Sequence, residues 1–507
     1  MIVDPYAHVR RMQSETHPTP DPDLVNATAA DRSHAPAVLR NTALQIAGHV
    51  FAIGLTATST IIVTRFLGVD GYGRFTVLTV FLMIGLSVSD FGLNGTAVRW
   101  FAGGERPEEV FASLIGLRLV LSSAAAVTAL AVFSLYPHHD VPFSAVALTA
   151  VAMILAGVNV TIPTALQARL DFRLGVVLDL TARAVALATY VAAALLITSP
   201  DPNRRLVAAA LGLPTGYLLA VIVGLAAVKR LSFPIIPAFH PRTWQRLLRD
   251  ALPLGIVTVL GLASYRLDAL VLALLKDSYD VGIYGLAYRF MEAAVPLGAF
   301  IVAVVFPLLV SDESGKERRA LQIARAADLL LVVSVGAAVA TIVIAPDLVR
   351  IVGGAAYEPA VLPLRILVLS LPFTFVGMLL SWTLVARGLQ RRLIPIAAIG
   401  VVLNLTLNVA LVPTYSYRAS AAVTLATEAL GAIVLTILVR RWVGASPSPR
   451  SVIQIVLSGA IALAAGLLFT FAGEIVGTVV AVVSFAGLVL AFGLVSRSEF
   501  EALVRRR

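Results

Sequence analysis

Apolar runs of membrane-spanning length recur through this sequence from about residue 39 to residue 495, separated by short charged or glycine-containing loops. A helix needs about 20 apolar residues to cross the hydrocarbon core of a bilayer, and each run reaches that length. The composition agrees, because 13% of the residues are charged, against about 25% in soluble domains. Lipid offers no partners to backbone groups, and the runs lack the alternation of barrel strands, so the spans must be helical. The sequence therefore predicts an all-α integral membrane protein.

The runs divide into about fourteen expected transmembrane helices. A faint internal repeat relates them: Tyr72-Gly73 matches Tyr284-Gly285 at an offset of 212 residues, which places spans one to six over spans seven to twelve. Six is an even number, so both copies enter the membrane from the same side, as parallel repeats do. We therefore expect two six-helix bundles and an additional C-terminal helix pair. The expected span limits are 40–64, 75–99, 109–134, 142–165, 174–198, 206–228, 251–275, 283–310, 326–345, 361–386, 393–412, 419–439, 452–472 and 475–495.

The expected domains follow from these spans. The first segment is polar and rich in proline, which predicts a disordered tail and not a cleavable signal. In the longest cytoplasmic connection, Trp244, Leu247 and Ala251 recur at helical spacing beside several arginines, which predicts an amphipathic helix on the inner leaflet. A short linker helix with solvated arginines is the alternative. The expected units are a disordered cytoplasmic tail (1–38), an N-terminal bundle (39–228), the linker (229–250), a C-terminal bundle (251–442), and a further hairpin with a basic tail (443–507).

The loops carry Lys and Arg unevenly. The two tails and the even-numbered loops, with their edges, hold 27 of the 39 Lys and Arg, and the odd-numbered loops hold 8. Cytoplasmic loops are enriched in these residues, so both termini are expected in the cytoplasm, as an even number of spans also requires. The same distribution accounts for the net charge of +10 without nucleic-acid binding.

Charged side chains inside the spans are the candidate functional residues, because a charge at that depth costs at least about 2.5 kcal/mol. Guanidinium groups bind phosphate oxygens in a bidentate manner, so buried arginines favour an anionic ligand such as a pyrophosphate-linked lipid. We expect a positively charged cavity whose substrate-binding residues are Arg118, Arg183, Arg266, Arg289 and Glu292.

The partners of these charges are expected as follows. Asp268 and Arg289 lie at similar depth on neighbouring spans, which predicts a contact between them that leaves Arg266 and Glu292 free to face the cavity. The alternative is that all four only lock the two helices together. Arg183 has a second interpretation, in which it pairs with Asp179 one turn earlier.

Several kinds of chemistry are not expected. The chain has no cysteine, which excludes thiol catalysis, thiolate metal sites and disulfides. It has no P-loop or nucleotide fingerprint, so neither ATP hydrolysis nor any enzyme activity is expected, and we expect no cofactor or metal. Asn404 and Asn408 share one face of a span, where such residues more often join helices than contact a ligand.

Three stretches carry a family resemblance. The first is Arg65-Phe-Leu-Gly68 with Tyr72-Gly73, followed by Asp90-Phe91-Gly92-Leu93 and Arg99; the second is Asp268 with Gly282-Ile283-Tyr284. The third is Asn404-x3-Asn408-x2-Leu411-Val412-Pro413-x-Tyr415, then Ala421-Ala422 and Glu428. In this order they resemble the polysaccharide (Wzx-type O-antigen) flippases of the multidrug/oligosaccharidyl-lipid/polysaccharide exporter superfamily. The glycines that the family carries after Pro-x-Tyr are replaced by SYRAS at 416–420.

The resemblance implies two six-helix bundles that expose a central cavity to one side of the bacterial plasma membrane at a time. The implied substrate is an undecaprenyl-pyrophosphate-linked oligosaccharide, moved from the inner to the outer leaflet for surface polysaccharide assembly. The implied energy source is an H+ or Na+ gradient or the membrane potential, for which Asp90, Asp268 and Glu428 are the ion-coupling candidates. The expected partners are the lipid-linked oligosaccharide, membrane lipids and a polysaccharide polymerase, and not nucleic acid.

Three other functions are alternatives to this interpretation. A drug or cation antiporter of the same superfamily would need a cavity dominated by acidic and aromatic groups. A flippase for peptidoglycan precursors of the lipid II type would share both the fold and the basic cavity. A membrane glycosyltransferase would need a large loop with paired carboxylates or a histidine, and no loop here is long enough.

Overall fold

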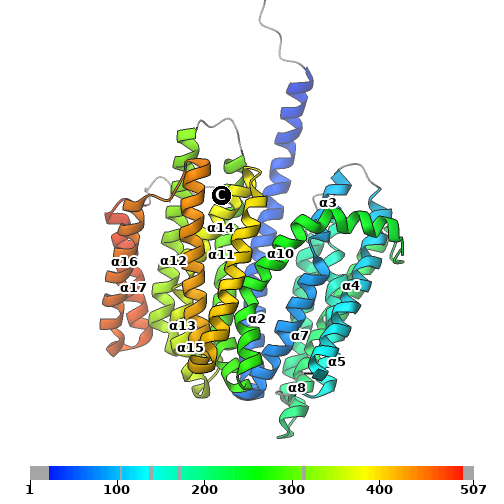
Figure 1. Cartoon of the computed structure of the whole chain (residues 1–507), viewed down its shortest axis with the longest axis horizontal. Helices are drawn as coiled ribbons and strands as arrows, with labels where there is room; N and C mark the ends of the chain where they lie inside the picture. Colours follow the sequence, from blue (N-terminus) through cyan, green and yellow to red (C-terminus); the bar gives the residue numbers. More distant parts are fainter. Residues whose placement is uncertain are drawn as a thin grey trace, which may run out of the picture.

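The computed structural model describes residues 22–102, 106–135, 141–167, 173–231, 233–310 and 316–494, and all regular elements within these ranges are helices. Eleven of the described helices are long and apolar enough to cross a membrane, or twelve if a bent pair in Pro241–Leu275 counts as one span. The helices lie side by side, as Figure 1 shows. The expected all-α membrane fold is therefore confirmed, while the count of fourteen spans stays a prediction.

Two of the long helices contain a break where the sequence predicts a loop. Helix α2 (Pro22–Asp90) has Gly68 at φ 70°, and α15 (Leu393–Val443) has Ser416 at φ 51°. These positions separate the first expected span from the second and the eleventh from the twelfth. Glycine adopts a positive φ without steric cost, whereas at Ser416 the Cβ atom makes this conformation unfavourable. Ser416 lies in the stretch where the family's glycines are absent. At 1.5 Å per residue, each of these helices is long enough for two crossings. Helix α2 begins at Pro22 and therefore includes residues 22–38 of the expected tail.

The other helices follow in two groups, which Figure 1 shows on opposite sides of the molecule. The N-terminal group contains α3 (Leu93–Ala102), α4 (Pro107–Leu135), α5 (Phe143–Thr161), α6 (Thr164–Gln167), α7 (Arg173–Leu196), α8 (Pro202–Ala210) and α9 (Gly212–Arg230). The C-terminal group contains α10 (Pro241–Leu275), α11 (Ser278–Val310), α12 (Lys316–Val352), η1 (Ala355–Ala360), α13 (Val361–Val368), α14 (Leu371–Ala386), η2 (Gln390–Arg392) and α15. The last elements are α16 (Pro449–Leu468), η3 (Thr470–Ala472) and α17 (Glu474–Ala491).

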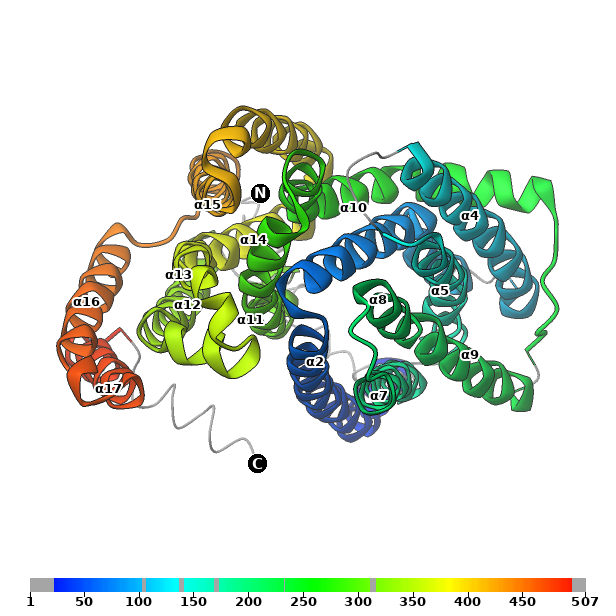
Figure 2. The same cartoon turned by 90° about the horizontal axis from the view of Figure 1, so that it is seen from below.

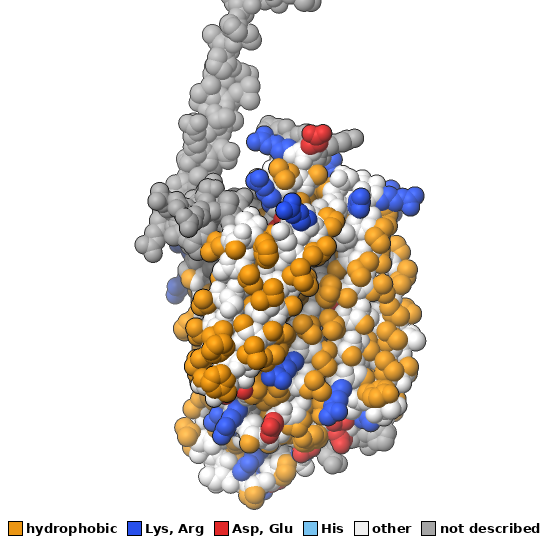
Figure 3. All heavy atoms as spheres, turned by 90° about the vertical axis from the view of Figure 1, so that its left-hand side faces the viewer, with side chains coloured by type: hydrophobic (Ala, Val, Ile, Leu, Met, Phe, Trp, Pro, Cys, Tyr) orange, Lys and Arg blue, Asp and Glu red, His pale blue; other side chains and the backbone are white. Residues whose placement is uncertain are grey.

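The outer surface of the α16–α17 side is apolar across its middle. Figure 3 shows hydrophobic side chains covering this band, with most charged side chains near the two ends of the molecule. Ile453, Val456 and Val483 are among the exposed apolar side chains there. Between α16 and the helices α12, α14 and α15 lies an apolar groove of about 670 Å³. This surface suits contact with lipid, as expected for a multi-pass membrane protein.

The linker helix differs from its expected position. It forms the first part of α10, and Figures 1 and 2 show α10 running from the N-terminal group to the C-terminal group. Leu247 and Ala251 are fully buried in a cluster with Leu93 and Leu114, and Trp244 Nε1 donates to the carbonyl oxygen of Ser113 at 3.0 Å. Part of the apolar face of the helix therefore packs on α3 and α4, which offer an apolar surface of their own.

The two bundles meet along a line of glycines, which we call the glycine seam (Gly73, Gly282 and Gly285). A Cβ atom on Gly73 would lie 1.7 Å from the carbonyl oxygen of Ser278, and one on Gly282 would lie 2.3 Å from that of Val69. The backbones of α2 and α11 therefore touch, which only glycine permits. The two repeated Tyr-Gly dipeptides both lie in this region, so the repeat marks the crossing point of the bundles.

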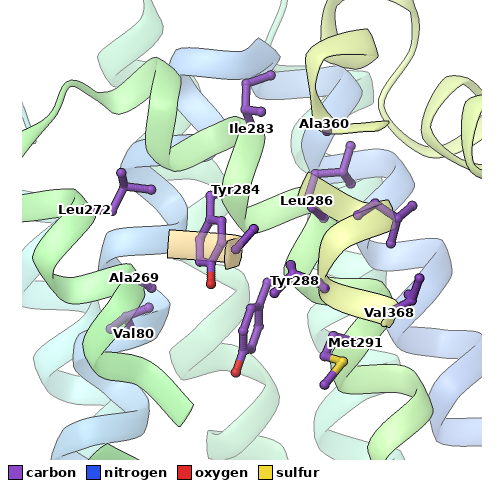
Figure 4. Close-up of a cluster of buried hydrophobic side chains, with 14 of the residues drawn as sticks. Val80, Ala269, Leu272, Ile283, Tyr284, Leu286, Tyr288, Met291, Ala360 and Val368 are labelled. Carbon is purple, nitrogen blue, oxygen red and sulfur yellow. The ribbon is translucent and has the colours of Figure 1, made fainter. Parts of the chain in front are cut away.

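The largest buried apolar cluster surrounds the seam and draws on both bundles. It contains Leu78 and Val80 of α2, Tyr284 and Leu286 of α11, and Val368 of α13. The close-up in Figure 4 shows side chains of this cluster from several helices converging beside α11. The core of the molecule is therefore shared between the bundles at this crossing point.

Candidate functional site

Arg118 of α4 lies in an ion pair inside the N-terminal bundle. Its Nη2 donates to Asp90 Oδ1 at 2.6 Å and to Asn94 Oδ1 at 2.9 Å, and its Nε donates to Thr161 Oγ1 at 3.0 Å. Arg118 is 1% exposed, so its guanidinium relies on these protein groups and not on bulk water. The expected cavity-lining position of Arg118 is therefore corrected, and Asp90, expected as an ion-coupling residue, is its counter-charge.

Arg183 of α7 pairs with Asp179, as the alternative prediction for this residue stated. Its Nε donates to both carboxylate oxygens of Asp179 at 3.0 Å, and its Nη1 donates to Thr56 Oγ1 at 2.7 Å. The spacing of four residues places both side chains on one helix face, so the pair is local. Both side chains line a cavity of about 250 Å³ between α2, α7 and α9.

Arg266, Arg289 and Glu292 form a cluster between the bundles, which we call the arginine triad. Glu292 accepts a hydrogen bond from Arg266 through one oxygen and, at 2.9 Å, from Arg289 Nη1 through the other. Arg289 Nε also donates to Tyr72 OH of α2 at 3.3 Å, and Arg266 Nη2 lies 2.8 Å from Met83 Sδ of the same helix. Two guanidinium groups share one carboxylate, so the triad carries a net charge of +1.

The expected contact between Asp268 and Arg289 is wrong. Arg289 bonds Glu292, which lies three residues later on the same face of α11, so Glu292 and Arg266 are not free. The guanidinium carbon of Arg266 lies over the ring of Tyr288, 5.3 Å from its centroid. Tyr284 and Tyr288 extend from the same helix beside this site (Figure 4).

Asp268 is 1% exposed and belongs to a polar network in the C-terminal bundle. It accepts from the hydroxyl of Tyr284, from Thr424 Oγ1 at 3.0 Å and from the backbone N–H of Ala269 at 2.7 Å. Glu428, one turn beyond Thr424 on α15, accepts from Thr374 Oγ1 at 2.9 Å. We call Asp268, Tyr284, Thr374, Thr424 and Glu428 the carboxylate network.

The other half of α15 adds polar groups to this network. Asn404 Nδ2 donates to Thr427 Oγ1 at 3.3 Å, and Asn408 Nδ2 donates to Asn404 Oδ1 at 3.1 Å. Within the described part of the chain, the buried oxygens Asn408 Oδ1 and Ser420 Oγ have no hydrogen-bond partner. A buried oxygen without a donor is costly, so these two atoms have acceptor capacity that no protein group of the described residues uses.

The site therefore offers two kinds of chemistry. The arginine triad has one excess positive charge for an anion, and the carboxylate network has oxygen ligands for a cation. No group of three or more His, Asp or Glu side chains suited to a metal ion occurs among the residues that the structure describes. Sequence reasoning missed Thr424 as a partner of Asp268, and it used Tyr72 and Tyr284 as repeat markers without a bonding role.

Comparisons with known proteins identify the family and the fold of the chain. The model of a family described as polysaccharide biosynthesis protein matches residues 38–313. No curated protein matches the chain. A structure of the lipid II flippase MurJ in an inward closed conformation is similar, with a TM-score of 0.76 at 14% identity over 92% of this chain and 100% of that chain.

Two further structures share the fold. An inward-facing multidrug resistance MATE family transporter of the MOP superfamily has a TM-score of 0.63 at 14% identity, over 77% of this chain and 94% of that chain. A MOP superfamily transporter from Pyrococcus furiosus, described by the reverse polarity of its binding pocket, has a TM-score of 0.57 at 14% identity, over 80% of this chain and 95% of that chain. At such identities these likenesses establish the fold alone.

Proposed function

The chain belongs to the polysaccharide biosynthesis protein family, and from this premise we propose that it moves a lipid-linked oligosaccharide across the bacterial plasma membrane by alternating access. The substrate is joined to its isoprenoid carrier through pyrophosphate and passes from the inner to the outer leaflet for surface polysaccharide assembly. Both termini face the cytoplasm in this proposal, and a polysaccharide polymerase receives the product.

The observation that carries the proposal is the arginine triad between the bundles. A pyrophosphate diester is a compact dianion, and guanidinium groups bind its oxygens with charge-assisted hydrogen bonds. Arg266 and Arg289 together hold more positive charge than Glu292 neutralises, so an anion at this position gains from the excess charge. The triad joins α10 and α11 and contacts α2 of the other bundle, so a headgroup bound there contacts both bundles.

The hydrocarbon part of the substrate does not need to pass between the two bundles. The apolar groove between α16 and the helices α12, α14 and α15 suits an isoprenoid chain, because its lining includes Val335, Val376 and Val456. Keeping this chain in an apolar environment avoids the free-energy cost of transferring it to water.

Coupling to an ion gradient is proposed at the carboxylate network. Asp268 lies two residues from Arg266 on α10, so a proton or Na+ at Asp268 changes the charge beside the triad. Ser420 Oγ, which has no hydrogen-bond partner among the described residues, lies one helical turn before Thr424, the donor to Asp268. Glu428 is the second carboxylate of this network and a second candidate for protonation.

The chemistry of the triad separates this function from one of its rivals. An organic cation, the substrate expected of a drug antiporter, would be repelled by the excess positive charge. A lipid II type substrate also contains pyrophosphate, so the triad accepts both kinds of lipid, and the matching family model favours the polysaccharide precursor.

The test is deletion of the gene followed by analysis of lipid-linked intermediates. We expect the precursor to accumulate on the inner leaflet and export to return with the wild-type chain but not with Arg289→Gln. Arg106→Gln is the control, because it removes an arginine that is exposed and paired with Glu109 outside the triad. Unchanged intermediates together with altered tolerance to cationic drugs would contradict the proposal and favour an antiporter.

A further inference from the structure

The cavity of about 250 Å³ in the N-terminal bundle is not used by the mechanism above. Its walls are formed by both halves of α2, by α7 and by α9. Among its described lining residues, Arg289 alone comes from the C-terminal bundle. Arg289 is also a member of the arginine triad, so the cavity opens beside the proposed pyrophosphate position.

The cavity has paired charges, unlike the triad. Asp179 and Arg183 neutralise each other, yet their side chains are 49% and 40% exposed, so both present free edges to the cavity. Thr56, Ser59 and Thr60 add hydroxyl groups from α2. Away from Arg289, the cavity has closely spaced donors and acceptors and no excess charge, and such a surface suits a neutral ligand rich in hydroxyl groups.

Aromatic rings form another wall of the cavity. Tyr190 packs edge-on against Phe75 with ring centroids 6.1 Å apart, and a Cβ atom on Gly212 would lie 2.1 Å from Tyr190 Cε1. Glycine at position 212 is therefore required for the tyrosine to occupy this place. Tyr190 and Tyr217 both line the cavity, and a tyrosine combines an apolar ring face with a polar hydroxyl. The two faces of a sugar ring, with their C–H groups and hydroxyls, match such a surface.

We propose that this cavity is a saccharide subsite that receives the sugar ring attached directly to the pyrophosphate. The inference rests on the proposed function, because it requires the pyrophosphate at the triad. Pockets for drug-sized ligands measure about 300–1,000 Å³, so a cavity of about 250 Å³ accommodates one ring and not a chain of several. Arg289 lies at the junction between the two subsites, as the bond between sugar and phosphate requires.

The test measures equilibrium binding to the purified full chain in lipid nanodiscs. The probes are farnesyl diphosphate and three farnesyl-diphosphate monosaccharides, which carry an N-acetylhexosamine, a hexose or a 6-deoxyhexose. We expect at least one glycosylated probe to bind about tenfold more tightly than farnesyl diphosphate, because the cavity's polar groups then gain partners.

Two variants remove the subsite in different ways. Ser59→Leu fills the cavity, and the double variant Asp179→Asn with Arg183→Gln keeps its volume and neutrality but changes its donors and acceptors. Both are expected to reduce the preference for the sugar to within about twofold while leaving farnesyl diphosphate binding unchanged. Thr58→Leu is the matched control, because Thr58 is the neighbouring residue on α2 and its side chain is exposed.

The outcomes separate the two proposals. If farnesyl diphosphate binds and Arg289→Gln weakens it, but no sugar improves binding, the saccharide subsite is wrong and the proposed function stands. Retention of the sugar preference in Ser59→Leu and in the double variant also overturns the subsite. Failure of the wild-type chain to bind farnesyl diphosphate, or indifference of that binding to Arg289→Gln, overturns the proposed function and the subsite with it.

Discussion

Arg118 and the arginine triad are two buried arginine sites with different charge balance. Arg118 pairs with one carboxylate, that of Asp90, and donates to two neutral oxygen acceptors. Its side chain is 1% exposed. Arg266 and Arg289 share Glu292, and their side chains are 12% and 23% exposed. The first site is an ion pair within one bundle, in which Arg118 is buried while the Asp90 side chain is 28% exposed, and the second lies between two bundles. The two sites therefore differ in their balance of charge and in the exposure of their arginine side chains, and our proposal assigns the anion to the site with excess positive charge.

The largest expected effect is on stability, at the pair of Arg118 with Asp90. Arg118→Ala leaves Asp90 without its counter-charge; breaking a fully buried pair from one side costs about 3–5 kcal/mol, and the 28% exposure of Asp90 places the cost at the lower end of that range. We expect a strong fall in protein level and in melting temperature, measured in membranes and in detergent. Replacing both charges, as Asp90→Asn with Arg118→Gln, should restore most of the protein. A stable Arg118→Ala protein that fails only in transport would contradict the division drawn here.

The next effect is on transport, at the triad. Arg266→Gln and Arg289→Gln each remove a charge-assisted partner of the headgroup, worth at least about 2 kcal/mol, or roughly thirtyfold in binding. We expect export of the lipid-linked precursor to fall by about that factor, measured by its appearance on the outer leaflet. Each variant leaves Glu292 with one guanidinium, so protein level is expected to change little. Normal export in both variants would remove the triad from the mechanism.

A smaller effect is expected at the glycine seam. Gly73→Ala places a methyl group against the carbonyl oxygen of Ser278, and overpacking of this kind costs about 1–3 kcal/mol. The seam should open more often, so a cysteine introduced at Thr76 should react faster with a maleimide in this naturally cysteine-free chain. Gly54→Ala is the control, since a Cβ there meets nothing within 4 Å. Equal labelling rates in the two variants would show that the seam does not limit access.

The smallest effect is expected at Arg183. Its pair with Asp179 is local and its side chain is 40% exposed, and pairs of this kind contribute about 0–1 kcal/mol. Arg183→Gln should therefore shift the melting temperature far less than Arg118→Ala, measured in the same detergent. A fall as large as that of Arg118→Ala would mean that exposure does not separate these sites.

The fold was predictable because lipid restricts the backbone to helices, and the apolar runs mark where those helices lie. The local pair of Arg183 with Asp179 was also predictable, because helical spacing alone places the two side chains together. The contact expected between Asp268 and Arg289 failed because the relative rotation of two helices is set by packing across the whole bundle.

The remaining site residues depend on contacts between distant parts of the chain. Asp268 meets Thr424 of α15, and Arg118 meets Asp90 of α2, and neither sequence separation indicates the contact. The repeated Tyr-Gly dipeptides gave a usable signal, since both lie where α2 crosses α11. Their glycines are required there because the two backbones touch.

Helix α10 has a mechanical consequence. Its first part packs on α3 and α4 of the N-terminal bundle, whereas Arg266 and Asp268, near its other end, bond residues of the C-terminal bundle. Between Pro241–Gly261 and Arg266–Leu275 the axis turns by 55°. A change in the angle between the bundles must therefore alter this elbow, which ends at Arg266. The bend and the proposed anion site are adjacent on one helix, so in the proposed alternating-access cycle each change in the angle between the bundles changes the direction of the Arg266 guanidinium.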